Sequence, residues 1–190
     1  MSDVDLLGTI VGSKTAAQLL KDAGGSLTKV LYESMPSCNV RPRVRTKLRI
    51  ATELVRRSLI EPMRQRDVLT SPASVRDYLR MTLTGRDYEV FMVLFLDAQH
   101  RVLESEEMFR GTLTQTSVYP REVVKRSLVN NAAAVIFAHN HPSGVAQPSH
   151  ADELLTRSLK DALALVDVKV LDHFVVAGSA VMSFAERGLL

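Results

Sequence analysis

Apolar residues in the first third of the chain recur at the three- and four-residue spacing of amphipathic helices. One segment, KTAAQLLKDAGG, ends at Gly24 and Gly25, which suit a helix C-terminus. A second, SLTKVLYESM, opens with Ser26, a favourable N-cap residue. A third, RTKLRIATELVRRSLIE, has an apolar stripe opposite its arginines, made of Leu48, Ala51, Val55 and Leu59. This part of the chain is therefore predicted to be helical.

The pattern changes after a largely polar stretch from Glu61 to Ser71, which we predict to be a linker. It divides the chain into a helical region, 1–66, and a larger domain, 67–190. In the larger domain YEVFMVLFLD and AAAVIF are nearly continuous apolar runs, which predict strands buried on both faces. RVLESEEMF is predicted to pair antiparallel with the first run, and VKVLDHFVVAG and AVMSFA to add two more strands. Three helical segments, SPASVRDYLRMTL, PREVVKRSLVNN and SHADELLTRSLKDALALV, alternate with them, so we predict an α/β layered fold.

The charges are distributed unevenly along the chain. Residues 1–66 contain 12 Lys and Arg against six Asp and Glu, a net charge of +6. Residues 67–190 contain 12 against 15, a net charge of −3. A basic front and a mildly acidic body indicate two units with different partners.

Two compositional features exclude whole classes of protein. No apolar run approaches the roughly 20 residues of a membrane span, and the N-terminal stretch is acidic where a secretory signal is basic. We therefore expect a cytoplasmic protein that does not bind membranes. Cys38 is the sole cysteine, which excludes an internal disulfide and a thiolate zinc cluster. Any metal site must use His, Asp and Glu.

Two histidines stand where the second buried strand ends, in the segment FAHNHPSG. Because strand side chains alternate between faces, His139 and His141 should point the same way, with Asn140 turned away. Two such imidazoles make half a zinc site, or a pair of hydrogen-bonded loop histidines. Asp152, in the first turn of the next helix, could complete a His₂Asp set with a fourth position open, as in catalytic zinc sites. Ser149 and Asp152 also fit a helix capping box that needs no metal.

The segment HNHPSGVAQPSHAD resembles the JAMM metalloprotease motif, which has His-x-His, ten residues and Asp, with Ser three residues before the Asp. Residues 70–190 as a whole resemble the RadC family of bacterial proteins, and the N-terminal part does so more loosely. The resemblance implies a mixed β-sheet with flanking helices, of the JAMM/MPN, cytidine-deaminase-like kind. It also implies a zinc-dependent peptidase or isopeptidase with an unknown peptide or protein substrate. His139, His141 and Asp152 would bind the zinc ion, and Ser149 would stabilise the oxyanion.

JAMM enzymes also use an upstream glutamate as general acid and base. In the family it stands where the first core strand begins, directly after a helix, and Glu89 occupies that place here. A carboxylate at the start of an apolar strand needs a functional reason, so we prefer Glu89 to its rival Glu122. His173, in VLDHFVV, is interpreted as a strand-end histidine that packs near the site and is not a ligand.

Two other enzyme classes do not fit. HNH nucleases spread their catalytic residues over a hairpin and a helix, and the letters are not three consecutive residues. A zinc deaminase needs a PCxxC ligand pair, which one cysteine cannot supply.

RadC proteins carry an N-terminal helix-hairpin-helix-like region, a fold often used against the DNA backbone. Such hairpins usually contain glycines whose amides approach phosphate, but the matching stretch here, NVRPRVRTKL, has none. It retains a basic ridge made of Arg41, Arg43, Arg45, Lys47 and Arg49. This ridge indicates either weak, non-specific DNA binding or a solvated helix face. The alternative to a peptidase is therefore a DNA-associated repair or accessory protein that uses the JAMM fold as a binding platform.

Overall fold

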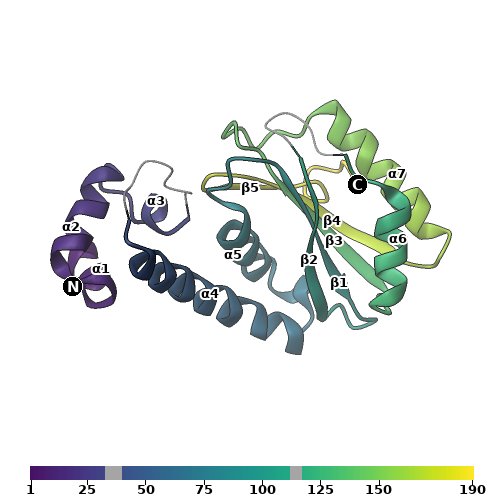
Figure 1. Ribbon diagram of the computed structural model, residues 1–190. Helices are drawn as coiled ribbons and strands as arrows, with labels where there is room; N and C mark the ends of the chain where they lie inside the picture. Colours follow the sequence, from purple (N-terminus) through teal and green to yellow (C-terminus); the bar gives the residue numbers. More distant parts are fainter. Residues whose placement is uncertain (33–39, 112–116) are drawn as a thin grey trace. The chain divides into compact units, whose positions relative to one another are not determined.

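The computed structural model describes residues 1–32, 40–111 and 117–190, and Figure 1 shows its elements. Cys38 lies outside the described residues. The chain divides into two compact units, Met1–Ser58 and Leu59–Leu190. We call them the N-terminal unit and the C-terminal unit.

The N-terminal unit is helical, as predicted. Its helices are α1 (Asp3–Val11), α2 (Ser13–Asp22), α3 (Leu27–Tyr32) and the first part of α4 (Pro42–Gln65). The Ser26 hydroxyl accepts a hydrogen bond from the Lys29 N–H, which confirms Ser26 as a cap of α3. The first helix, α1, was not predicted, although the side chains of Ser2 and Asp5 form a capping box at its start. A cluster of buried apolar side chains holds the unit together: Leu7, Ala16, Leu19, Leu20, Ala23, Val30, Val44 and Leu48.

One expectation about the middle of the chain is wrong. The predicted linker begins inside a helix, since α4 continues through Pro62 to Gln65 and is followed by a 3₁₀ turn, Val68–Thr70. The predicted apolar stripe does lie in one helix, α4, and its burial varies from Leu48, which is 7% exposed, to Val55, which is 49% exposed.

The C-terminal unit contains a five-stranded mixed sheet with the strand order β2-β1-β3-β4-β5. All neighbouring strands are antiparallel except β3 and β4, which are parallel and are connected through α7. The strands are β1 (Val90–Leu96), β2 (Val102–Arg110), β3 (Ala134–Asn140), β4 (Lys169–Ala177) and β5 (Ala180–Ser183). The α/β layered fold and its antiparallel first pair are confirmed. Within the described residues, no helix is long and apolar enough to cross a membrane.

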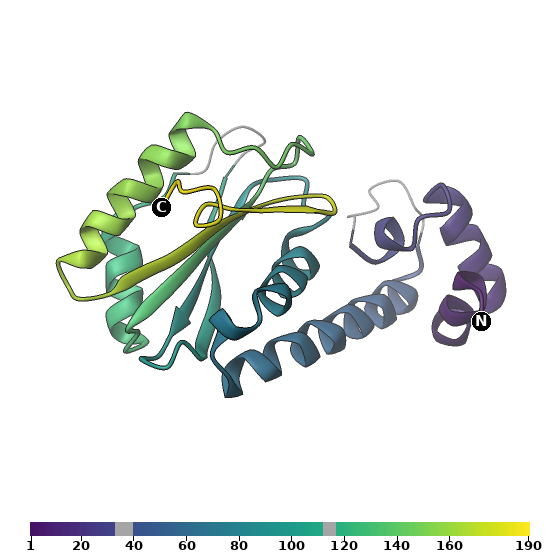
Figure 2. The ribbon, with the colours of Figure 1, turned by 180° about the vertical axis from the view of Figure 1, so that it is seen from behind.

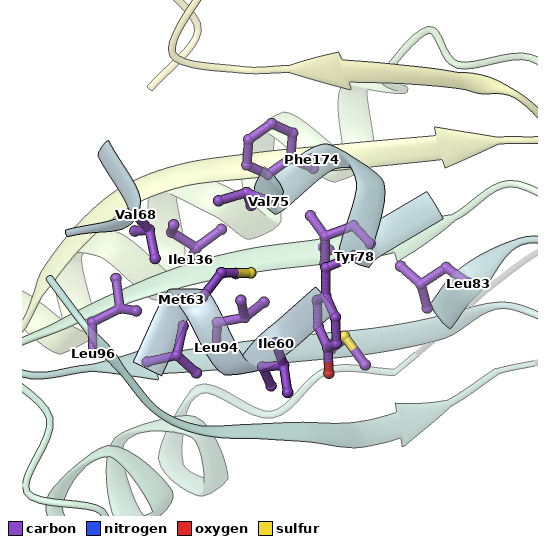
Figure 3. Close-up of a cluster of buried hydrophobic side chains, with 14 of the residues drawn as sticks. Ile60, Met63, Val68, Val75, Tyr78, Leu83, Leu94, Leu96, Ile136 and Phe174 are labelled. Carbon is purple, nitrogen blue, oxygen red and sulfur yellow. The ribbon is translucent and has the colours of Figure 1, made fainter. Parts of the chain in front are cut away.

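Helices cover both faces of this sheet. Figures 1 and 2 show α6 (Pro120–Val129) and α7 (His150–Ala164) on one face and α5 (Pro72–Leu83) on the other. Every residue of β1 and β3 is buried, because each strand has a hydrophobic cluster on both sides. The cluster under α5 also takes in Ile60 and Met63 from the end of α4 (Figure 3). The opposite cluster places Phe91 and Phe137 against α6 and α7.

Candidate metal centre

The two histidines lie together at the carboxyl end of β3, on the sheet face that α7 covers. Their Nε2 atoms are 2.9 Å apart, as the alternation of strand side chains predicts. The His139 residue is 6% exposed, while His141 begins the loop that leaves the sheet. Asn140 points to the other face, also as predicted.

The N-terminus of α7 brings a carboxylate to these imidazoles. Asp152 Oδ1 lies 3.3 Å from His139 Nε2, and Asp152 Oδ2 lies 3.5 Å from His141 Nε2. Asp152 also belongs to a capping box, in which Ser149 Oγ donates to Asp152 Oδ2 at 2.6 Å and accepts from the Asp152 N–H. Asp152 therefore caps α7 and at the same time lies next to the two histidines. The two histidines and this aspartate form a group that could hold a metal ion, with one ligand atom from each within 4.8 Å of the others.

The hydrogen bonds around the group favour a cation at its centre. His141 Nδ1 lies 2.8 Å from the Val145 carbonyl oxygen, which can only accept, so Nδ1 carries a proton. In neutral His141 the Nε2 lone pair therefore faces His139 and the Asp152 carboxylate. The hydrogen bond to Asp152 raises the pKa of His141, so a proton can occupy this position when no metal does. Burial raises the pKa of Asp152, but its interactions with the two histidines outweigh burial and keep the pKa below its ordinary value.

Glu89 precedes β1 and is half-buried. Phe91 lies opposite His139 in the β1–β3 pair, and continuing this register by two residues places Glu89 opposite His141 on the same face. The negative charge of Glu89 is among the causes that raise the pKa of His141. The other candidate, Glu122, lies in the first turn of α6 and pairs with Arg121 at 3.4 Å. Of the two glutamates, Glu89 is the one whose charge acts on the histidine pair.

Asn140 holds the backbone on both sides of Glu89. Its Oδ1 accepts from the Val90 N–H at 2.8 Å, and its Nδ2 donates to the Tyr88 carbonyl oxygen at 2.9 Å. The Asn140 residue is only 3% exposed. The middle letter of the HNH tripeptide thus fixes the position of the segment that carries Glu89. The sequence alone gives no sign of this role.

A second layer of polar side chains lies behind His139. His139 Nδ1 is 2.8 Å from His173 Nε2, and His173 Nδ1 is 2.7 Å from Thr156 Oγ1. His173 lies in the middle of β4, fully buried among aromatic rings, so its description as a strand-end residue is wrong. Thr156 was missed, although it follows Asp152 by one turn on the same helix face.

Comparison with known proteins agrees with this geometry. Residues 69–189 match the family model described as RadC-like JAB domain. A UPF0758 protein of Nitrosomonas eutropha is 54% identical over 201 aligned positions, which cover 100% of this chain and 90% of that protein. A UPF0758 protein of Leptothrix cholodnii is 65% identical over 149 positions, 78% of this chain and 67% of that protein. These names state no activity.

Proposed function

Because this chain belongs to the family of RadC-like JAB domains, we propose that it is a zinc-dependent hydrolase of peptide or isopeptide bonds. The observation that carries the proposal is the convergence of His139, His141 and Asp152 on one point beside Glu89. Nitrogen and carboxylate ligands suit zinc, and three protein ligands leave a position for water or substrate. When bound, zinc would supply an electrophilic centre that polarises a carbonyl group and acidifies water.

The protein groups around this centre have separate proposed roles. Glu89 takes the proton of the attacking water and later gives it to the departing amine nitrogen. Asn140 keeps the backbone of Glu89 in place through its two hydrogen bonds.

Ser149 is the proposed donor to the carbonyl oxygen as negative charge develops on it. Its hydroxyl now donates to Asp152 Oδ2, which also accepts from the Ser149 N–H at 2.7 Å. If the hydroxyl turns toward a substrate oxygen, the carboxylate therefore keeps its hydrogen bond to the backbone.

The metal assignment is tested by elemental analysis of the purified full chain. We expect about one zinc ion per chain, and His139→Ala or Asp152→Ala should lose most of it. His150→Ala is the matched control, because His150 is exposed, lies two residues before Asp152 and is outside the ligand group. Unchanged zinc content in both ligand variants would contradict the assignment.

The acid–base assignment is tested by a pair of isosteric variants. With a library of peptides whose amide bond releases a fluorescent amine, Glu89→Gln should reduce hydrolysis by about 100-fold or more while keeping zinc. Glu122→Gln should retain activity within about twofold, since its carboxylate pairs with Arg121. If the two outcomes are exchanged, Glu122 is the acid and base.

A second candidate function rests on the surface of the N-terminal unit. Arg41, Arg43, Arg45 and Arg49 are exposed on or beside the first half of α4. This surface suits the phosphate backbone of DNA, and the C-terminal unit would then act as a binding platform. The site around Glu89 favours the hydrolase, because a platform needs no acid and base.

A further inference from the structure

The hydroxyl group of Thr156 contacts both Asp152 and His173. Its Oγ1 lies 2.6 Å from the Asp152 carbonyl oxygen and 2.7 Å from His173 Nδ1. A carbonyl oxygen only accepts, and a hydroxyl has one proton to donate. The Thr156 hydroxyl therefore donates to Asp152, and it accepts the N–H of His173 Nδ1.

This direction determines the proton on the next ring. His173 is fully buried among aromatic rings, and its two ring nitrogens face the Thr156 hydroxyl and the His139 ring, neither of which is an anion. A positive charge on this ring would be buried without a carboxylate beside its nitrogens, so the ring is neutral. A neutral imidazole has one N–H, which His173 uses toward Thr156. Its Nε2 is then an acceptor, 2.8 Å from His139 Nδ1. His139 must donate from Nδ1, which leaves a lone pair on its Nε2.

That lone pair is the one that faces His141 and Asp152. We propose that Thr156 and His173 form a positioning relay that fixes His139 as its Nδ1–H tautomer and aims Nε2 at the metal. The relay rests on the proposed metal centre for its purpose. The relay also connects two proposed ligands that lie in different elements, Asp152 in α7 and His139 in β3. Thr156 bonds to the Asp152 backbone, and His173 bonds to the His139 ring. Neither Thr156 nor His173 touches the metal.

The aromatic surroundings keep the relay ring still. The His173 ring stacks on Phe184, with centroids 4.7 Å apart and planes inclined by 20°. The ring centroids of Phe91 and Phe137 lie 5.6 and 5.8 Å from the His173 centroid, and both pairs are edge-on. A ring confined in this way cannot rotate to exchange its two nitrogens without displacing its neighbours.

The test uses the full chain and two measurements. The first is the ¹⁵N NMR signature of the imidazoles in the metal-free protein at neutral pH, where five histidines allow assignment by single substitutions. His139 should be protonated at Nδ1 in the wild type and in Thr156→Ser. In Thr156→Val, His173 loses its acceptor, and a substantial population of His139 should carry its proton on Nε2.

The second measurement is zinc affinity by competition with a chromophoric chelator. Thr156→Val should bind zinc about 10- to 100-fold more weakly, and Thr156→Ser should stay within about threefold of the wild type. Rescue by serine separates the hydroxyl's role from a general loss of packing. An unchanged affinity and tautomer in Thr156→Val would overturn the relay while leaving the metal centre intact.

The relay and the metal centre can fail separately. If the wild type binds no zinc, the proposed function is wrong, and the imidazole spectra still decide whether the relay exists. If Thr156→Val does not fold, the wild-type spectrum decides alone, because a proton on His139 Nε2 contradicts the hydrogen-bond sequence.

Discussion

The two units of this chain differ in whether their interiors contain polar residues. In the N-terminal unit the buried residues are apolar, and the charged residues of α4 lie at the surface. In the C-terminal unit polar residues enter the core, among them Asn140, Thr156 and His173. Within the described part of the chain, all fully buried polar residues belong to this unit.

The difference has a physical meaning. A buried polar group costs free energy unless it is hydrogen-bonded, so it is retained where its bonds do something that packing cannot. Thr156 and His173 each bond to a member of the metal group, and Asn140 bonds to the residues on both sides of Glu89. The N-terminal unit needs no such interior, and any function it has must reside on its surface.

The largest effect is expected when the two units are separated. A chain that starts at Leu59 should fold and bind zinc, because it keeps the whole C-terminal core. A chain that starts at Asp67 loses Ile60 and Met63, which are 7% and 3% exposed. Removing each should cost on the order of 2–5 kcal/mol, so this chain should be much less stable. Urea unfolding of both chains measures the difference, and equal stability would show that the end of α4 adds nothing to the core.

This result would also revise the boundary predicted from the sequence. The polar residues of 61–71 and two prolines predicted a linker, because a proline such as Pro62 usually kinks or ends a helix. Met63, however, follows the proline and is buried in the core cluster on one face of the sheet. This packing stabilises the helix beyond the point where the sequence predicts that it ends. Tertiary contacts of this kind are not visible in a short window of sequence.

The sheet and the metal group were easier to predict for a related reason. The strands β1 and β3 are apolar along their whole length because they are buried on both faces, and such runs are readable from composition alone. The metal group could be predicted because its three residues are close in sequence and follow strand and helix periodicities.

The supporting residues could not be found in this way. Asn140 acts through the register of β1 on β3, and His173 acts through the pairing of β3 with β4. Both depend on contacts between segments that are 30 or more residues apart. A single sequence gives no direct signal of such a register.

A smaller effect is expected from the surface of the N-terminal unit. If it binds DNA through phosphates, replacing Arg43 and Arg45 with Ala should weaken binding of a labelled duplex by several-fold. The loss should be similar for unrelated duplex sequences and smaller at higher salt. Fluorescence anisotropy at two salt concentrations measures it.

The control for this variant removes the same charge elsewhere. Arg121 and Lys125 are exposed on α6 in the C-terminal unit, so the double alanine variant should leave binding nearly unchanged. Lys47 is left intact, because its Nζ donates to the Ile10 carbonyl oxygen at 2.8 Å and fastens α4 to the end of α1. Equal loss in both variants would mean that net charge, and not the ridge on α4, controls binding.

The smallest expected effect concerns an ion-pair group on α4. Hydrogen bonds from Arg56 and Arg57, each with an N···O distance of 2.7 Å, lower the pKa of Glu53 to about 2. A carboxylate with a depressed pKa stabilises the folded state above its unfolded pKa of about 4.5, and this contribution is lost as pH falls toward 2. The Glu53 side chain is 39% exposed, so water screens the pairs and the contribution should stay below about 1 kcal/mol. Thermal unfolding should show Glu53→Gln slightly less stable than the wild type at pH 6, and the difference should shrink at pH 3. Glu61→Gln, a charge change on the same helix outside this group, is the control. A difference that grows on acidification would contradict the assignment.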